Sequence, residues 1–150
     1  MAKMDRLLAM AALLALTGCN ASQVDISAAS LAGSFSFANA GLERSNYSSA
    51  NLAGVNFSGA DLDYANFSRA NLAGANLSNV SATETLLVDA NLAGADLTNA
   101  KFFGAGLQGA NLKGANIDYA AFDGANLTGA TWVDGKVCGA NSIGRCLEPR

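Results

Sequence analysis

Histidine is absent from the 150-residue sequence, and several other residue types are scarce. Without histidine the chain lacks the commonest general base and the commonest metal ligand, which argues against most hydrolytic and zinc-based mechanisms. Proline occurs once, and charged residues make up only 14% of the chain, with a formal net charge of −3. So small a charge indicates neither a basic nucleic-acid surface nor a strongly acidic mimic of one. We therefore expect a protein that is not an enzyme and binds no metal, cofactor or nucleic acid.

Apolar residues, in contrast, account for 51% of the chain, which excludes a disordered polypeptide. Most of them are alanine and leucine, aromatic residues contribute only 7%, and glycine occurs 16 times. Such a narrow set of residue types is typical of internal repeats, so we expect one domain built from a repeated unit.

The amino terminus has the features of a targeting segment. Lys3 and Arg6 precede an apolar run from Leu7 to Leu16. This run is too short to cross a bilayer, which requires about 20 residues. A basic start, a short apolar stretch and small residues before a cleavage site predict a secretory signal peptide over residues 1–18. A buried amino-terminal helix is the alternative interpretation.

The end of this segment, Leu16-Thr17-Gly18-Cys19, resembles the lipobox of bacterial lipoproteins. The resemblance implies diacylation of the Cys19 thiol, cleavage before Cys19 and acylation of the new amino terminus. Lipid chains would anchor the mature protein to a membrane without crossing it, and residues 19–33 would form a lipidated tether. Asn20 is not the aspartate associated with inner-membrane retention. We therefore expect a lipid-anchored protein of the cell envelope, on the periplasmic side of the outer membrane.

A five-residue repeat runs without insertion from Ala40 to Gly139, which gives 20 units. The third position of every unit is large and apolar except at Ala82, the first position is small and usually alanine, and the second is often Asn or Asp. A period of five fits neither a helix nor an uninterrupted strand. Positions one and three can share one face of a short strand, after which the chain must turn. Repeated turning of this kind describes a solenoid.

This pattern resembles the pentapeptide-repeat family. The resemblance implies an all-β fold over residues 34–139, a right-handed quadrilateral parallel β-helix with four units to a coil and therefore about five coils. Third-position side chains would meet on the axis and stack on the residue one coil, or 20 positions, away. One such predicted ladder consists of Leu52, Leu72, Leu92, Leu112 and Trp132.

Two segments depart from the repeat. Residues 80–89 keep the five-residue frame but lose several consensus residues, which predicts a bulge or a locally widened coil. The alternative is that outward-pointing Leu86 and Val88 form a contact patch. At the start, Leu31 lies one residue out of the later frame, so we expect an irregular amino-terminal cap there.

Residues 140–150 are expected to cap the carboxyl end, because an open solenoid end exposes strand edges and interior side chains. Cys138 and Cys146 remain after Cys19 is assigned to lipid. An even pair in an oxidising compartment predicts a disulfide. A two-cysteine metal site is the competing interpretation, but without histidine it lacks ligands.

Sorting the units by side of the predicted coil places most of the acidic residues of the repeat units on one side, together with outward-pointing Tyr64 and Phe103. This side carries a net charge of −3, with Arg44 and Lys101 as its basic residues. We predict that it is the partner-binding face, whereas charges that merely solvate the rod are the plainer interpretation. Its acidic residues are Glu43, Asp61, Asp63, Glu84 and Asp123.

These features favour a non-enzymatic, envelope-anchored lipoprotein that acts as a structural or protein-interaction module and binds another envelope protein. The family resemblance supplies an alternative, because some pentapeptide-repeat proteins mimic duplex DNA and bind the topoisomerase DNA gyrase, conferring quinolone resistance. Those proteins act in the cytoplasm. The lipobox and the paired cysteines instead indicate the envelope.

Overall fold

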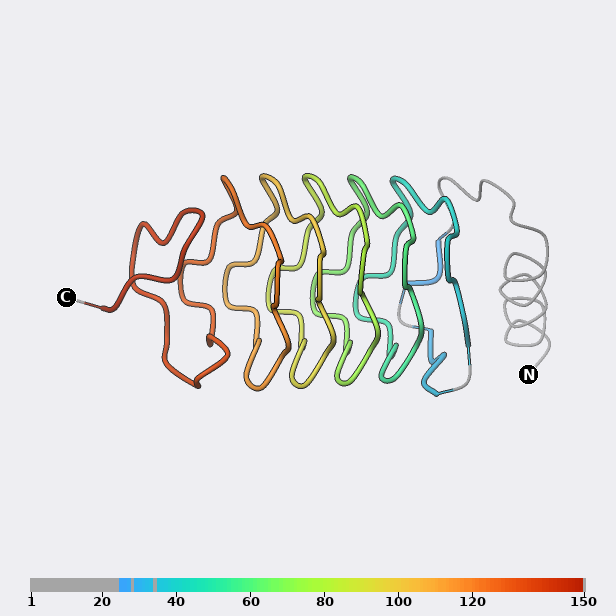
Figure 1. The fold of residues 1–150 in the computed structure, drawn as a ribbon. Helices are drawn as coiled ribbons and strands as arrows, with labels where there is room; N and C mark the ends of the chain where they lie inside the picture. The colour runs from blue at the N-terminus through green and yellow to red at the C-terminus, as the bar shows by residue number, and fades with distance from the viewer. Residues whose placement is uncertain (1–24, 28, 34, 150) are drawn as a thin grey trace.

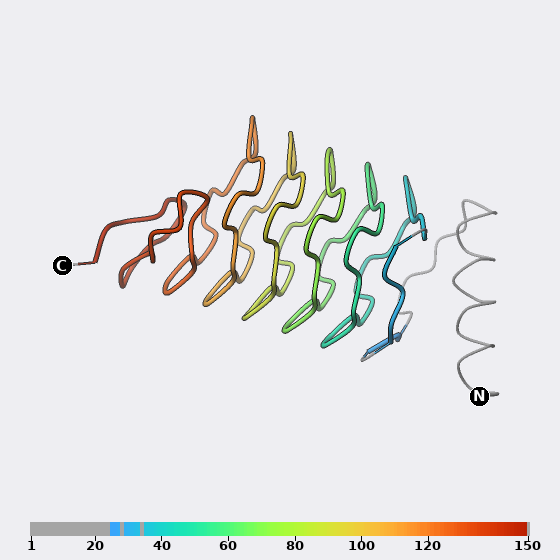
Figure 2. The same cartoon turned by 90° about the horizontal axis from the view of Figure 1, so that it is seen from below.

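The computed structural model describes residues 25–27, 29–33 and 35–149. The predicted signal peptide, the lipobox and Cys19 lie outside these residues. The described chain winds into a rod of stacked coils with its carboxyl terminus at one end (Figures 1 and 2). Within the described ranges no residue belongs to a helix, and β-structure occurs only as isolated single-residue bridges separated by turns. This explains how an all-β solenoid can exist without extended strands.

From Ser36 to Thr131 the parallel bridges fall into four columns, and successive members of a column lie 20 residues apart. One column joins Asn51, Asn71, Asn91, Asn111 and Thr131 by parallel bridges. Since each coil therefore takes four five-residue units, the third-position residues repeat their place on the axis in every coil. This register builds the parallel β-solenoid that the repeat predicts.

Hydrogen bonds between coils follow one rule, which the unit at residues 70–74 illustrates. The Leu72 N–H donates to the Asn91 carbonyl at 2.7 Å, in the following coil, and the Asn91 N–H donates back to the Ala70 carbonyl at 2.9 Å. The Ala75 N–H donates to the Leu72 carbonyl at 3.0 Å and closes the turn. The fifth position of the unit has a positive φ, 63° at Gly74, which explains why glycine and asparagine recur there.

The interior is filled as the repeat predicts. Leu52, Leu72, Leu92 and Leu112 are each completely buried and lie one coil apart. First-position alanines fill the narrow space between the larger side chains. Aromatic rings stack in the same way near the amino-terminal end, where the Tyr47 and Phe67 ring centroids lie 4.5 Å apart. The axis of the described coils is therefore a closed apolar core.

The solenoid begins earlier than predicted. Ile26 and Leu31 are buried in the core, and the first bridges join residues 21 apart, Asp25 to Asn46 and Ser30 to Asn51. From Ser36 onward the spacing is 20. One extra residue after Leu31 shifts Ile26 and Leu31 out of the later five-residue frame, so the repeat in the sequence does not identify them as core residues. The predicted tether over 19–33 is thus wrong in its second half, because residues 25–27 and 29–33 already belong to the coil.

The predicted bulge at residues 80–89 is also wrong, since the bridges through Ser81 and Leu86 keep the 20-residue spacing on both sides. Val80 and Thr85 replace the first-position alanines and are buried. The Thr85 hydroxyl donates to the Leu62 carbonyl at 2.8 Å, so its burial leaves no polar group unsatisfied. The segment tolerates its unusual residues without a change of register.

The carboxyl end leaves the repeat before Gly139, at a turn over Asp134 and Gly135. Val137 occupies the third position of the last predicted unit, so the repeat predicts it to lie in the core. It instead forms an antiparallel bridge with Thr131 and is 52% exposed. Trp132 is only half-buried at the top of its ladder and packs edge-on against Phe122. The capping segment therefore starts at the turn near residue 134 and not at 140.

Cys138 and Cys146 form the predicted disulfide in this cap. Cys138 is buried against the last coil, and its N–H donates to the Ala130 carbonyl at 2.8 Å. The Ser142 hydroxyl donates to the Gly139 carbonyl at 2.7 Å and accepts from the Leu147 N–H at 3.1 Å. The disulfide thus fastens the tail to a segment that is itself bonded to the coil.

Candidate interaction surface

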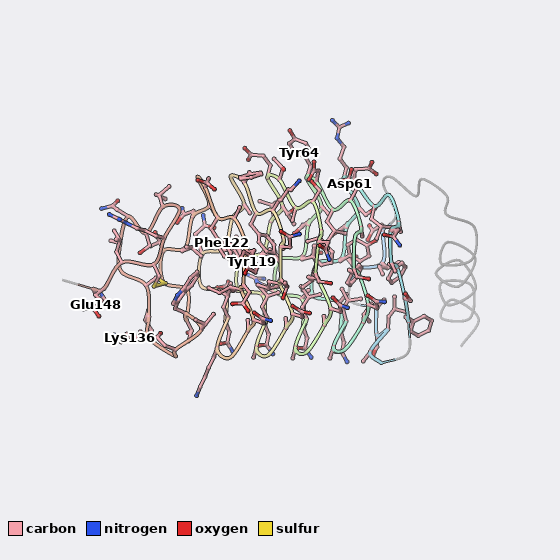
Figure 3. The ribbon with its side chains drawn as sticks, viewed as in Figure 1. Asp61, Tyr64, Tyr119, Phe122, Lys136 and Glu148 are labelled. Carbon is pink, nitrogen blue, oxygen red and sulfur yellow. A yellow bond between two sulfur atoms is a disulfide. The ribbon has the colours of Figure 1, made fainter. Side chains whose placement is uncertain are left out.

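The acidic residues predicted to share a side do so. The bridge column Gly41, Asp61, Ser81, Lys101 and Ala121 aligns the units 40–44, 60–64, 80–84, 100–104 and 120–124, which we call the acidic side. Asp61 and Tyr64 project from this side in Figure 3. The fourth positions of these units form one row and the fifth positions form the adjoining corner. The row contains Glu43, Asp63, Thr83, Phe103 and Asp123, and the corner contains Arg44, Tyr64, Glu84, Gly104 and Gly124.

Two aromatic side chains are exposed on the acidic side, as predicted. Tyr64 is 56% exposed and Phe103 is 39% exposed. Glu84 belongs to the coil between those of Tyr64 and Phe103. It occupies the same corner as Tyr64, one coil later, and its N–H donates to the Phe103 carbonyl in the following coil at 2.8 Å. The Glu84 carboxylate lies against Gly104, where a Cβ atom would meet its Oε1 at 2.7 Å. The surface therefore offers two rings that flank a carboxylate.

The Arg44 guanidinium lies over the Tyr64 ring, 5.7 Å from its centroid. This distance is within the range of a cation–π contact, which is weak at an exposed site. The contact places the guanidinium against the Tyr64 ring of the next coil. Arg44 thus supports an aromatic side chain besides offsetting part of the negative charge.

Three carboxylates gather at the amino-terminal end of the acidic side. Burial raises the pKa of Asp61 above its ordinary value, and the neighbouring carboxylates of Asp63 and Glu43 add to the increase, against the Asp63 N–H, which lowers it. Asp63 is held firmly, because its Oδ1 accepts from the Ser81 hydroxyl and the Thr83 N–H, each at 2.8 Å. The negative charge here is concentrated and fixed in position.

These carboxylates do not make a metal centre. No group of three or more Asp, Glu or Cys residues in the described part of the chain is placed to hold a metal ion. Nor does any helix among the described residues have the length and apolar character needed to cross a membrane. What the acidic side offers a ligand is charge and aromatic surface on a fixed backbone.

Leu86 and Val88 form the other predicted patch, on the side next to the acidic side. Leu86 is 46% exposed and Val88 is half-buried. Gly106 follows Leu86 in the bridge column, and a Cβ there would meet Leu86 Cδ2 at 3.6 Å and Val88 Cγ2 at 3.9 Å. Both side chains therefore lean over a glycine in the next coil, which limits the apolar surface they present.

One exposed aromatic residue was missed. Tyr119 is 87% exposed and occupies a fifth position, like Tyr64, but near the carboxyl end. The signal in the sequence is the same in both cases, an aromatic residue at the corner position where glycine or asparagine is usual. The sequence did not show that the coil carrying Tyr119 is the last one on its side.

Comparison with known proteins identifies the family. Eight copies of the pentapeptide-repeat model match this chain over the segments 42–79, 50–89, 83–117, 98–131 and 105–141. Since these segments together span about two thirds of the chain, the chain belongs to the pentapeptide-repeat family. Comparison with curated proteins gave no match.

Several solved structures are similar. A pentapeptide-repeat protein from the thylakoid lumen of Arabidopsis thaliana shares 35% sequence identity with this chain, and the two structures superpose with a TM-score of 0.62. The match covers 64% of this chain and 66% of the Arabidopsis protein, which is just under two thirds of that protein's length. HetL, involved in heterocyst differentiation regulation in the cyanobacterium Nostoc sp. strain PCC 7120, shares 30% identity with a TM-score of 0.38, over 79% of this chain and 62% of HetL. QnrB1, a plasmid-mediated fluoroquinolone resistance protein, shares 24% identity with a TM-score of 0.42, over 73% and 60% of the two chains.

Proposed function

We propose that this chain is a non-enzymatic envelope lipoprotein whose four-sided rod, of about five coils, presents the acidic side to a protein partner. The observation that carries the proposal is the exposure of Tyr64 and Phe103 on either side of Glu84. Aromatic residues at the centre of a surface, surrounded by polar groups, are typical of residues that dominate binding energy. Because the interior is filled, recognition falls to the outer walls.

The partner that fits is a protein with basic residues around an apolar contact. The carboxylates of Glu43, Asp61 and Asp63 would steer such a partner and set its orientation, while the aromatic rings would supply most of the affinity. The hydrogen bonds between coils hold the side rigid, so little ordering entropy is lost on binding.

The proposed anchor is the lipid on Cys19. The lipobox motif and the Cys138–Cys146 disulfide both support an oxidising envelope compartment, and the residue after Cys19 supports the outer membrane. Because the coil already includes Asp25, only about five residues would separate the lipid from the rod. At about 3.3 Å per extended residue the rod would lie within roughly 20 Å of the membrane. Replacement of Cys19 by serine should therefore move the protein from the membrane fraction to the soluble periplasmic fraction.

Gyrase binding by DNA mimicry finds no support in the side-chain arrangement. A duplex mimic requires regularly spaced negative charge, whereas Phe103 and Thr83 interrupt the row of carboxylates and Lys101 adds positive charge. A supercoiling assay with the purified protein addresses this alternative directly. Potent inhibition would reverse our preference.

Site-specific photo-crosslinking in intact cells tests the proposed face. A photoreactive residue in place of Glu84, between the two rings, should give one discrete adduct, and the same residue in place of exposed Lys113 on another side should not. Alanine at Tyr64 and Phe103 should abolish the adduct, whereas Tyr119→Ala should leave it. An adduct that survives the double substitution would show that the acidic side is not the binding face.

A further inference from the structure

The carboxyl-terminal segment covers only part of the last coil. Residues 131–133 pair with one side, through the Leu112 N–H to the Thr131 carbonyl at 2.8 Å and the Gly114 N–H to the Val133 carbonyl at 2.9 Å. The chain then reverses and passes directly to another side. There the Leu127 N–H donates to the Ser142 carbonyl at 2.7 Å and the Gly129 N–H to the Cys138 carbonyl at 2.9 Å. Residues 115–122, which we call the open edge, lie between these two covered sides.

The backbone of the open edge has unused hydrogen-bonding groups. One coil earlier the N–H groups of Leu97, Asn99 and Phe102 donate to the next coil, and the carbonyls of Ala95 and Ala100 accept from it. In the described part of the chain, the equivalent groups of the last coil have no backbone or side-chain partner. They are the N–H groups of Ile117, Tyr119 and Phe122 and the carbonyls of Ala115 and Ala120. Donors and acceptors alternate along this edge as an added strand requires.

The side chains along this edge are also less covered than their equivalents in the preceding coil. Ala115 and Phe122 are each 8% exposed, against 0% for Ala95 and 1% for Phe102. Ile117 is half-buried and Tyr119 is 87% exposed. Figure 3 shows Tyr119 and Phe122 apart from Lys136 and Glu148, which lie in the cap. The edge therefore combines unpaired backbone with uncovered apolar surface.

We propose that the open edge binds an extended segment of another protein as an added partial coil. The added segment takes the parallel register in which every preceding coil from Ser36 to Thr131 meets the next. A large apolar residue at the third position of the segment covers Ile117. The open edge meets the acidic side at residues 120–122, but the inference rests on unpaired backbone groups and not on the rings at Tyr64 and Phe103, so it does not depend on the proposed function.

The charge around the open edge specifies a basic segment. Fourth-position side chains stack outward from coil to coil, so the fourth residue of an added unit falls beside the exposed carboxylate of Asp118. Asp123 adds charge of the same sign on the adjoining side. The segment that fits thus reads small, Asn, large apolar, basic, Gly. The unit Ala110–Gly114 of this chain, ANLKG, has this pattern and serves as a model for the probe.

Binding is tested with the acetylated and amidated peptide ANLKGANL, titrated into ¹⁵N-labelled full-length protein. Saturable shifts of the amide resonances of Ile117, Tyr119 and Phe122 are expected, together with slower hydrogen exchange at these amides. The matched peptide ANLEGANL should bind at least tenfold more weakly. Asp118→Lys should reverse this preference. Asp89→Lys is the control, because it makes the same charge change at a corner away from the open edge, where a basic residue, Arg69, already stands one coil earlier; it should preserve the preference.

Three results would overturn the inference. The first is the absence of shifts at the three amides with ANLKGANL, and the second is equal binding of both peptides to the unaltered protein. The third is concentration-dependent association without peptide, seen by sedimentation equilibrium together with shifts at the same amides. That result would assign the open edge to a second copy of this chain.

Discussion

The side-chain amide nitrogen of Asn91 donates a hydrogen bond to Oδ1 of Asn71 in the preceding coil, at 3.0 Å. The same bond recurs along this side, from Asn71 to Asn51 at 3.0 Å and from Asn111 to Asn91 at 3.2 Å. Each Oδ1 also accepts the backbone N–H two residues ahead, as Asn91 does from Ala93 at 3.2 Å. Asparagine at the second position therefore stabilises both its own turn and the stacking of coils.

Asn91→Asp is expected to lower the free energy of unfolding by about 1–2 kcal/mol at pH 7. The carboxylate retains the acceptor for Ala93 but loses the donor to Asn71, and it faces the Asn71 Oδ1 across the stack. Chemical denaturation measures the change. Asn126→Asp is the matched control, because Asn126 accepts from Thr128 at 3.1 Å while its neighbours in the bridge column are Gly106 and Ile143. Equal losses in the two variants would show that the ladder adds no stability.

Asp61→Asn is expected to raise the free energy of unfolding at pH 7. Burial and the nearby carboxylates raise the pKa of Asp61 from 3.8, so the folded state binds the proton more tightly than the unfolded state. Stability contributed by this group is thus fully present below pH 3.8 and is lost as the pH rises through the folded-state pKa. The asparagine amide carries no charge and keeps the acceptor for the Asp63 N–H.

The gain in the free energy of unfolding of Asp61→Asn should be at most about 1 kcal/mol at pH 7, as for other partly exposed charges, and should vanish near pH 3. Thermal unfolding of the variant and the unaltered protein across this pH range measures it. Asp96→Asn is the control, since Asp96 also occupies a second position but stands between Asn76 and Asn116. A gain that is the same at pH 3 and pH 7 would contradict the electrostatic explanation.

Reduction of the Cys138–Cys146 disulfide, or replacement of both residues by serine, is expected to loosen the cap and leave the coils folded. The chain-entropy estimate for so short a loop is about 2.5 kcal/mol. Amides that bond to the cap, those of Leu127 and Gly129, should exchange faster, whereas the Leu92 amide should keep its protection. Hydrogen exchange resolved by residue measures both. Equal acceleration at Leu92 would mean that the cap and the coils unfold as one unit.

The regular part of this fold could be predicted closely from the sequence. An unbroken five-residue frame dictates which residues stack 20 positions apart, and this places Leu72 over Leu92 as well as Asp61, Tyr64 and Phe103 on one side. Register in a solenoid propagates from each coil to the next, so one correct frame fixes all of them.

The ends could not be predicted in the same way, because no neighbouring coil dictates their register. At the start, a single extra residue after Leu31 concealed two buried core residues. At the other end, Val137 continued the five-residue frame in sequence while the chain had already reversed at Gly135. The open edge and the exposure of Tyr119 follow from that reversal, which depends on tertiary contacts of the cap.

A substitution at an open corner of the coil measures backbone strain alone, because the new side chain displaces no neighbouring atom. Gly54 has a φ of 71°, and no atom lies within 4 Å of the position that a Cβ would occupy. Gly54→Ala is therefore expected to cost roughly 1–2 kcal/mol, which is the penalty of the left-handed region alone. Gly54→Asn should cost less, because asparagine adopts this conformation at equivalent corners, at Asn79 and Asn99. Chemical denaturation of the two variants measures the difference, and an alanine variant as stable as the asparagine variant would refute the explanation of the fifth position.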